Sequence, residues 1–275
     1  MLSLTPRPLP PPFLLQSPPP RRLLLLAAKR GAEDDYHATI RTLNANGRRH
    51  APRKSLGQHY MLNSGINDAL AGVAGVEEGD VVLEIGPGTG SLTNALINAG
   101  ATVIAVEKVA WYHIAKVSAN ITLDNGWVVS NIPFNISTEV VKKLLPLGDV
   151  FSDVALLLQD ETAIRLSDVS LRSSECRPIN IFVNFYSDPQ YKSKVERTNF
   201  FPQPNVDAAI IRFKLKQVAE YPPVTSPKSF FSMINSAFNG KRKMLRKSLQ
   251  HICPSVEIEA ALTKIGLPVT VSYRP

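Results

Sequence analysis

The spacing of apolar residues predicts a helix that begins near residue 64 and ends near residue 75. Ile66, Leu70 and Val73 are three or four positions apart, which places their side chains on one face of a helix. Asn63 or Ser64 can cap the first turn, because either side chain accepts a hydrogen bond from a free backbone N–H group. Glycines soon after Val73 favour an end of the helix there.

Two apolar runs further along predict buried strands with a helix between them. The first strand is Val81 to Ile85 and the second is Thr102 to Val106. Between them, residues 91–99 carry apolar side chains at helical spacing, and Gly100 favours the end of that helix. Alternation of strand and helix is typical of an α/β domain with a largely parallel sheet.

The connection from the first strand to the second helix is rich in glycine, since residues 86–90 read Gly-Pro-Gly-Thr-Gly. Glycines let the backbone pass close to a ligand, and Glu107, 17 residues after Gly90, can accept hydrogen bonds from two ribose hydroxyls. An ordinary tight turn is the alternative. The glycine spacing differs from the Gly-x-Gly-x-x-Gly of dinucleotide sites, and Glu84 precedes the first glycine by two residues. Both features favour S-adenosylmethionine over a nicotinamide cofactor.

A second motif, Asn131-Ile132-Pro133-Phe134, follows the short apolar strand 127–129 and should lie at the ligand-binding edge of the sheet. The exocyclic amine of adenine is a poor nucleophile, because its lone pair is delocalised into the ring. An enzyme must therefore hold both N–H bonds in acceptors, and the Asn131 side chain and the Ile132 carbonyl can supply them. Phe134 offers a face on which an extruded base can stack. A plain turn with a core aromatic is the alternative reading.

Positive charge is concentrated in two blocks without acidic residues. Residues 1–32 contain five basic residues and eight prolines, a composition that predicts a disordered organelle import segment or, alternatively, a merely disordered tail. The longest apolar run, Leu23 to Ala28, is too short to span a membrane. Cys176 and Cys253 lie far apart, so neither a disulfide framework nor a metal site is expected.

The second basic block lies in a predicted helical region at residues 221–275. Val206 to Leu215 alternates apolar and polar residues as a half-exposed last strand does, and Tyr221-Pro222-Pro223 reads as a hinge. A helix bearing Phe230 to Phe238 should follow, and then a helix with basic residues on one side. Such a face neutralises RNA phosphates without reading bases, although a solvated charged face is the alternative. The candidate RNA contacts are Lys241, Arg242, Lys243 and Arg246.

Several motifs together make the chain resemble the ribosomal RNA adenine dimethyltransferases, over about residues 53–267, and most of all their plastid-type branch. The motifs, in order, are Lys54–Met61 (Lys-Ser-Leu-Gly-Gln-His-Tyr-Met), the loop Glu84–Gly90, Glu107, Asn131–Ser137 and Phe201–Asp207. The resemblance implies a Rossmann-like S-adenosylmethionine-dependent methyltransferase sheet, of α/β class, with a small C-terminal helical domain. It also implies N6,N6-dimethylation of two adjacent adenosines near the 3′ end of small-subunit ribosomal RNA.

Residue roles follow from the resemblance, position by position. It implies that His59 and Met61 line the cofactor pocket, that Gly86 and Gly88 lie against the cofactor, and that Glu107 holds its ribose. Asn131 would lie between cofactor and target amine, with Phe134 beside it. The expected division is residues 1–50 as transit peptide and linker, 51–220 as methyltransferase domain and 221–275 as a truncated RNA-binding domain.

The chain departs from the family pattern in two places, and these departures lead to alternative functions. The interval from Glu107 to Asn131 is short and lacks a strand ending in an aspartate, and the chain stops early after Leu267. We therefore expect reduced cofactor affinity, and a catalytically impaired factor that binds RNA or the pre-ribosomal small subunit is the alternative function. A related alternative keeps methyl transfer but acts on glutamine or DNA adenine. The protein is expected to be a monomer off the membrane, in the chloroplast or, alternatively, the mitochondrion.

Overall fold

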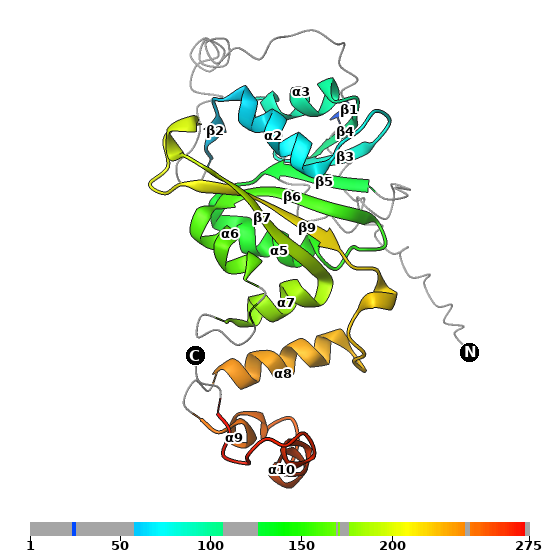
Figure 1. The fold of residues 1–275 in the computed structure, drawn as a ribbon, viewed down its shortest axis with the longest axis vertical. Helices are drawn as coiled ribbons and strands as arrows, with labels where there is room; N and C mark the ends of the chain where they lie inside the picture. Colours follow the sequence, from blue (N-terminus) through cyan, green and yellow to red (C-terminus); the bar gives the residue numbers. More distant parts are fainter. Residues whose placement is uncertain are drawn as a thin grey trace, which may run out of the picture.

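The computed structural model describes residues 24–25, 58–106, 126–168, 170, 176–239 and 243–272. Over these residues an α/β domain is followed by a helical region that extends away from it (Figure 1). Most of the proline-rich N-terminal block lies outside the described residues, as do Glu107, Lys241 and Arg242. No helix in the described ranges is long and apolar enough to cross a bilayer.

A seven-stranded mixed sheet forms the centre of the α/β domain. Its four neighbouring strands β4, β3, β5 and β6 are parallel, and the last two, β9 and β7, are antiparallel to their neighbours. At the other edge the short β1 pairs antiparallel with β4. In sheet order the strands are β1 (Leu24–Leu25), β4 (Thr102–Val106), β3 (Val81–Ile85), β5 (Gly126–Asn131), β6 (Phe151–Gln159), β9 (Ala208–Leu215) and β7 (Ser187–Val195).

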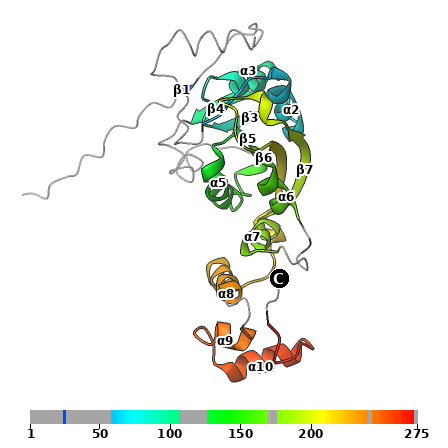
Figure 2. The ribbon, with the colours of Figure 1, turned by 90° about the vertical axis from the view of Figure 1, so that its left-hand side faces the viewer.

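Helices cover both faces of this sheet, as Figures 1 and 2 show. On one face lie α2 (Ser64–Ala74) and α3 (Ser91–Asn98). On the other lie α5 (Ser137–Leu144), α6 (Asp160–Ser167) and α7 (Pro178–Tyr186). Successive strand residues therefore enter two different cores, so the inner strands read as continuous apolar runs rather than as alternating ones.

The predicted helix ends are confirmed in α2. The Asn63 side chain caps the helix by accepting a hydrogen bond from the backbone N–H of Gly65 at 3.0 Å. Gly75 ends it in the left-handed region, at a φ of 70°. A polar side chain at the start and a glycine at the end satisfy backbone groups that a helix leaves unpaired.

A two-stranded sheet joins segments that lie about 140 residues apart in the sequence. β2 (Tyr60–Met61) pairs antiparallel with β8 (Phe200–Phe201), and the N–H of Leu62 donates to the carbonyl of Asn199 at 2.8 Å. The turn Arg197–Asn199 leads into β8. This small sheet holds the start of the α/β domain against the connection that precedes its last strand.

The helical region is attached to the α/β domain through aromatic side chains. Its helices are α8 (Pro227–Asn239), α9 (Leu245–Leu249) and α10 (Ser255–Lys264), which follow the short turn Val218–Glu220. Phe231 of α8 lies 5.0 Å from Phe182 of α7, and Phe230 lies 5.6 Å from Phe185, both between ring centroids. No residue of α8, which is described throughout, is buried. The aromatic contacts with α7 thus form the packed side of an otherwise accessible helix.

Candidate active site

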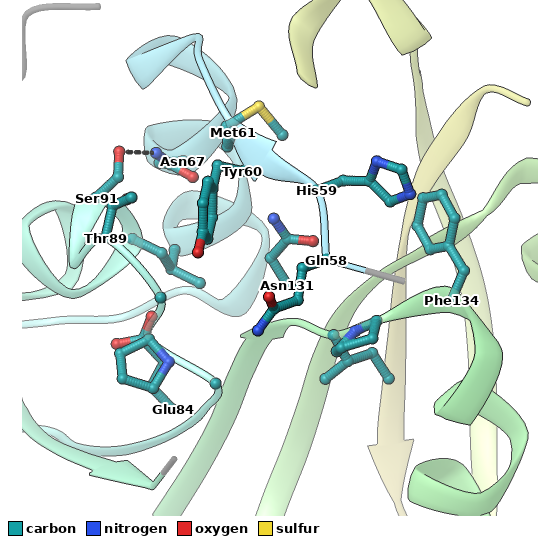
Figure 3. Close-up of a pocket in the computed structure, with 16 residues that line it drawn as sticks. Gln58, His59, Tyr60, Met61, Asn67, Glu84, Thr89, Ser91, Asn131 and Phe134 are labelled. Atoms are coloured by element: carbon teal, nitrogen blue, oxygen red, sulfur yellow. Dashed lines mark hydrogen bonds between the residues drawn. The ribbon is translucent and has the colours of Figure 1, made fainter. Parts of the chain in front are cut away.

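The sheet reverses its direction of growth between β3 and β5. The chain leaves β3 through α3 to β4 on one side, and leaves β5 through α5 to β6 on the other. Ligands of open α/β sheets bind at this kind of switch point, beyond the carboxyl ends of the strands. A cavity lies there and is lined by the glycine loop, the end of β5 and the β2 segment (Figure 3).

The glycine loop after β3 has a backbone that only glycine adopts easily. Gly86, Gly88 and Gly90 have φ angles of 74°, 55° and 83°, all in the left-handed region. The N–H of Gly86 donates to the carbonyl of Val106 at 2.8 Å, which ties the loop to the end of β4. A Cβ atom on Gly88 would lie 3.3 Å from the ring of Tyr60. The positions predicted to contact the cofactor therefore do form one wall of the cavity.

A buried carboxylate lies beneath this loop. Glu84 is 1% exposed, lines the cavity, and accepts a hydrogen bond from the Thr93 hydroxyl at 2.5 Å. Beside it, the Asn67 amide donates to the hydroxyl of Ser91 at 2.7 Å, and both residues also line the cavity. A carboxylate at such depth is favourable only where donors or cations meet it. The Glu84 carboxylate, with the polar side chains of Asn67 and Ser91 nearby, thus fits the positively charged end of S-adenosylmethionine.

The enclosed space in this first cavity is small. It amounts to about 80 Å³, whereas sites for small molecules typically measure about 300 Å³ or more. The ring of Tyr60 points into it from β2, above the glycine loop (Figure 3). The Tyr60 ring therefore forms part of the wall of this cavity, opposite Gly88.

Asn131 is the last residue of β5 and faces the same cavity. Among the described residues, no hydrogen bond engages its side-chain amide. The Ser130 hydroxyl donates to the carbonyl of Ile85 and holds the end of β5 against the end of β3. Pro133 fixes the backbone just before Phe134, which begins a short 3-10 turn. Asn131 thus faces the cavity, and half-buried Phe134 lines the same cavity beside His59 (Figure 3).

Two other predicted residues, His59 and Met61, lie on the β2 segment and line the same cavity. Met61 is 5% exposed and packs in the core beneath α2 and α3. The imidazole of His59 points instead toward Phe134 (Figure 3). Glu107, predicted to hold the ribose, lies outside the described residues.

A second cavity of about 600 Å³ opens on the far side of Phe134. His59 and Phe134 line both cavities and form the wall between them. The remaining lining of the second cavity is mainly side-chain amides: Asn135, Gln159, Gln203 and Asn205, with Pro204 and Val206. These amides were not among the predicted site residues. The Phe201–Asp207 motif contains Gln203 and Asn205, so it was the sequence signal for two of them.

Of the predicted RNA contacts, Lys243 and Arg246 are described. Lys243 is exposed, as is its neighbour Lys247. Arg246 is half-buried, and its guanidinium lies 2.7 Å from the Glu259 carboxylate of α10. Its charge is therefore largely satisfied within the helical region, and the two lysines carry the accessible positive charge of this described segment.

Sequence comparison identifies relatives among ribosomal RNA methyltransferases. A ribosomal RNA small subunit methyltransferase, chloroplastic, of Arabidopsis thaliana is 56% identical over 274 aligned positions, which cover 88% of this chain and 79% of that protein. A ribosomal RNA small subunit methyltransferase A of Protochlamydia amoebophila is 31% identical over 241 positions, covering 78% of this chain and 84% of the relative.

Solved structures share the fold. A dimethyladenosine transferase from Plasmodium falciparum superposes with a TM-score of 0.57 at 23% identity, covering 76% of this chain and 82% of that one. The 23S rRNA methyltransferase ErmE gives 0.55 at 20% identity, covering 78% and 93%. The predicted Rossmann-like α/β class is thereby confirmed.

The family model described as "Ribosomal RNA adenine dimethylase" matches residues 49–110 and 108–275. The two matched pieces overlap at residues 108–110, within the short interval between Glu107 and Asn131. With most of its length matched, this chain belongs to the ribosomal RNA adenine dimethylase family.

Proposed function

We propose that this protein transfers methyl groups from S-adenosylmethionine to the N6 amines of two adjacent adenosines near the 3′ end of small-subunit ribosomal RNA, in the chloroplast. The observation that carries the proposal is the position of the Asn131 amide, which faces the cavity beside the glycine loop, next to Phe134, and forms no hydrogen bond with the residues that the structure describes. The chloroplast is supported by the Arabidopsis relative, whose name includes that compartment. We also propose, as the sequence analysis expects, that it acts as a monomer.

In this proposal the protein prepares the amine rather than removing its proton. Asn131 and the Ile132 carbonyl accept one N–H bond each, so the nitrogen lone pair turns toward the methyl donor. Phe134 holds the base by stacking. The new bond forms between the amine nitrogen and the methyl carbon while the bond from that carbon to sulfur breaks. The methylated amine then releases its proton to water. The second methylation starts from an amine with one N–H bond, which only one of the two acceptors holds, and it forms and breaks the same kinds of bond.

The cofactor end of the site rests on the groups around the glycine loop. S-adenosylmethionine supplies an electrophilic methyl group carried on a sulfonium. The buried Glu84 carboxylate would bind positive charge on the methionine part, and the glycine backbone lets that part approach closely. Met61 and Glu107 remain proposed contributors to this end.

A second candidate function is RNA or pre-ribosome binding without methyl transfer. The short interval between Glu107 and Asn131 favours it. The chain would then keep the helical region and its exposed lysines as its working surface.

Methyl transfer to unmodified small ribosomal subunits tests the two functions directly. The full chain should transfer radiolabel from S-adenosylmethionine to the RNA, and Asn131→Ala should lower the rate by about 100-fold or more, because an acceptor aimed at the reacting amine is lost. Gln190→Ala, on the exposed side of β7, is the matched control and should keep the wild-type rate. Wild-type protein that binds the subunits without transferring label would overturn the enzymatic proposal in favour of the binding factor.

A further inference from the structure

The side chains of His59 and Tyr60, neighbours in the β2 segment (residues 58–61), point in opposite directions (Figure 3). Tyr60 points toward the glycine loop, where its ring meets the position of Gly88. His59 points toward Phe134 (Figure 3). Successive side chains of an extended segment alternate in direction, so this division follows from the backbone itself.

The imidazole of His59 is held in place by a long-range hydrogen bond. Its Nδ1 atom lies 2.6 Å from the carbonyl oxygen of Pro202, 143 residues further along the chain. A carbonyl oxygen can only accept, so Nδ1 carries the hydrogen and donates it. The bond fastens the β2 segment to the chain just after β8, where residues 203–206 begin to line the second cavity.

The same imidazole supports the ring of Phe134. The two rings are stacked with centroids 5.7 Å apart and planes 29° from parallel. Phe200 of β8 approaches Phe134 from another direction, at 6.4 Å and with its ring nearly perpendicular. Phe134 is therefore oriented by side chains from both segments that form the small sheet.

From this geometry we propose that His59 is a positioning residue for the target adenine. It holds one face of Phe134 and the Pro202 carbonyl, and so leaves the other face of Phe134 at a fixed angle for the base. The inference rests on the proposed function, and it moves the His59 side chain from the cofactor end of the site to the base end. Cofactor affinity should then be independent of the imidazole.

Three substitutions separate the two contacts that His59 makes. His59→Ala removes both contacts. His59→Asn keeps a donor at the same number of bonds from the backbone as Nδ1, and His59→Phe keeps a ring without the donor. Gln190→Ala again serves as the control, and thermal unfolding of each variant checks that the fold persists.

Calorimetry with S-adenosylmethionine, steady-state kinetics, and the fluorescence of 2-aminopurine placed at the target position of an RNA fragment give independent readouts. His59→Ala should lower kcat about tenfold, because a misplaced base is seldom in reacting geometry, while the cofactor Kd stays within about twofold of wild type. It should also lower the 2-aminopurine signal of the extruded base. His59→Asn and His59→Phe should each recover part of the loss in kcat and part of the loss in 2-aminopurine signal.

Two results would overturn the proposal. A weaker cofactor Kd at unchanged kcat would make His59 a cofactor ligand, and a stronger 2-aminopurine signal for His59→Ala would mean that the imidazole occupies the place of the base. If the wild-type chain transfers no methyl group, the proposed function fails, but the fluorescence comparison still judges whether His59 positions an extruded base.

Discussion

At the scale of single residues, the site consists of polar side chains at places where the sequence is otherwise apolar. Glu84 interrupts a buried strand, and Asn131 ends another. A polar group in such a place costs free energy unless it binds something, so the sequence alone marks these two residues as candidates for the cavity. The direction in which His59 points could not be read from the sequence, because its partner Pro202 is distant and carries no pattern that pairs with it.

Glu84→Gln tests the charge at the bottom of the cavity. The amide can still accept from Thr93, but it no longer attracts a cation, so the affinity for S-adenosylmethionine should fall about tenfold or more. Calorimetry measures the change. Thr93→Val is the matched control, since it removes the same hydrogen bond and keeps the charge, and it should weaken binding less. Equal affinity of wild type and Glu84→Gln would show that the carboxylate does not contact the cofactor.

At the scale of elements, local patterns predicted α2 from its apolar spacing and caps, and β3 and β4 from their apolar runs. A strand was also predicted where β9 lies, but as a half-exposed one, whereas residues 208–211 are buried because β6 and β7 flank β9 on both sides. The strand β7 was not predicted, because an edge strand with lysines and a proline has no clear apolar alternation. The small sheet of β2 and β8 was missed for another reason: two-residue strands are too short to show any period.

A pair of glycine substitutions tests the loop as an element. Gly88→Ala places a side chain at a φ of 55° and against Tyr60, so it should lower both the unfolding temperature and cofactor affinity. Gly72→Ala in α2 has no atom within 4 Å of the new Cβ and should raise stability by about 0.5–1 kcal/mol without touching binding. Differential scanning calorimetry and cofactor titration compare them. If both variants behave alike, the loop backbone has no special role.

At the scale of the whole molecule, the helical region extends from the α/β domain on aromatic contacts and bears the exposed Lys243 and Lys247. The domain boundary near residue 221 and the RNA-binding role of the basic block stay predictions from the sequence. The sequence could not predict that Arg246 is paired with Glu259, since residues 13 apart give no sign of which helices will pack together. The ion pair holds Arg246 against α10, and the contact of Arg246 with RNA stays a prediction.

RNA binding at several salt concentrations distinguishes these roles. Replacing Lys243 and Lys247 together by alanine should reduce the slope of log affinity against log salt by about 1.5. The variant would neutralise fewer phosphates, so fewer counterions would be released when it binds RNA. Arg246→Ala should leave the slope nearly unchanged and lower the unfolding temperature instead. Filter binding at matched temperatures gives both slopes. A slope that responds to Arg246 alone would place the RNA contact on the other side of the helix.

The pairing of β2 with β8 also constrains when the pocket can exist during synthesis. The segment that carries His59 and Tyr60 leaves the ribosome early, but its partner at Phe200–Phe201 follows only after most of the sheet has been made. Contacts between such distant segments form late, because a long intervening chain must first be ordered. The pocket is therefore completed only once the stretch from His59 to Pro202 can fold as a unit, and any unfolding that frees β8 would first separate His59 from the Pro202 carbonyl.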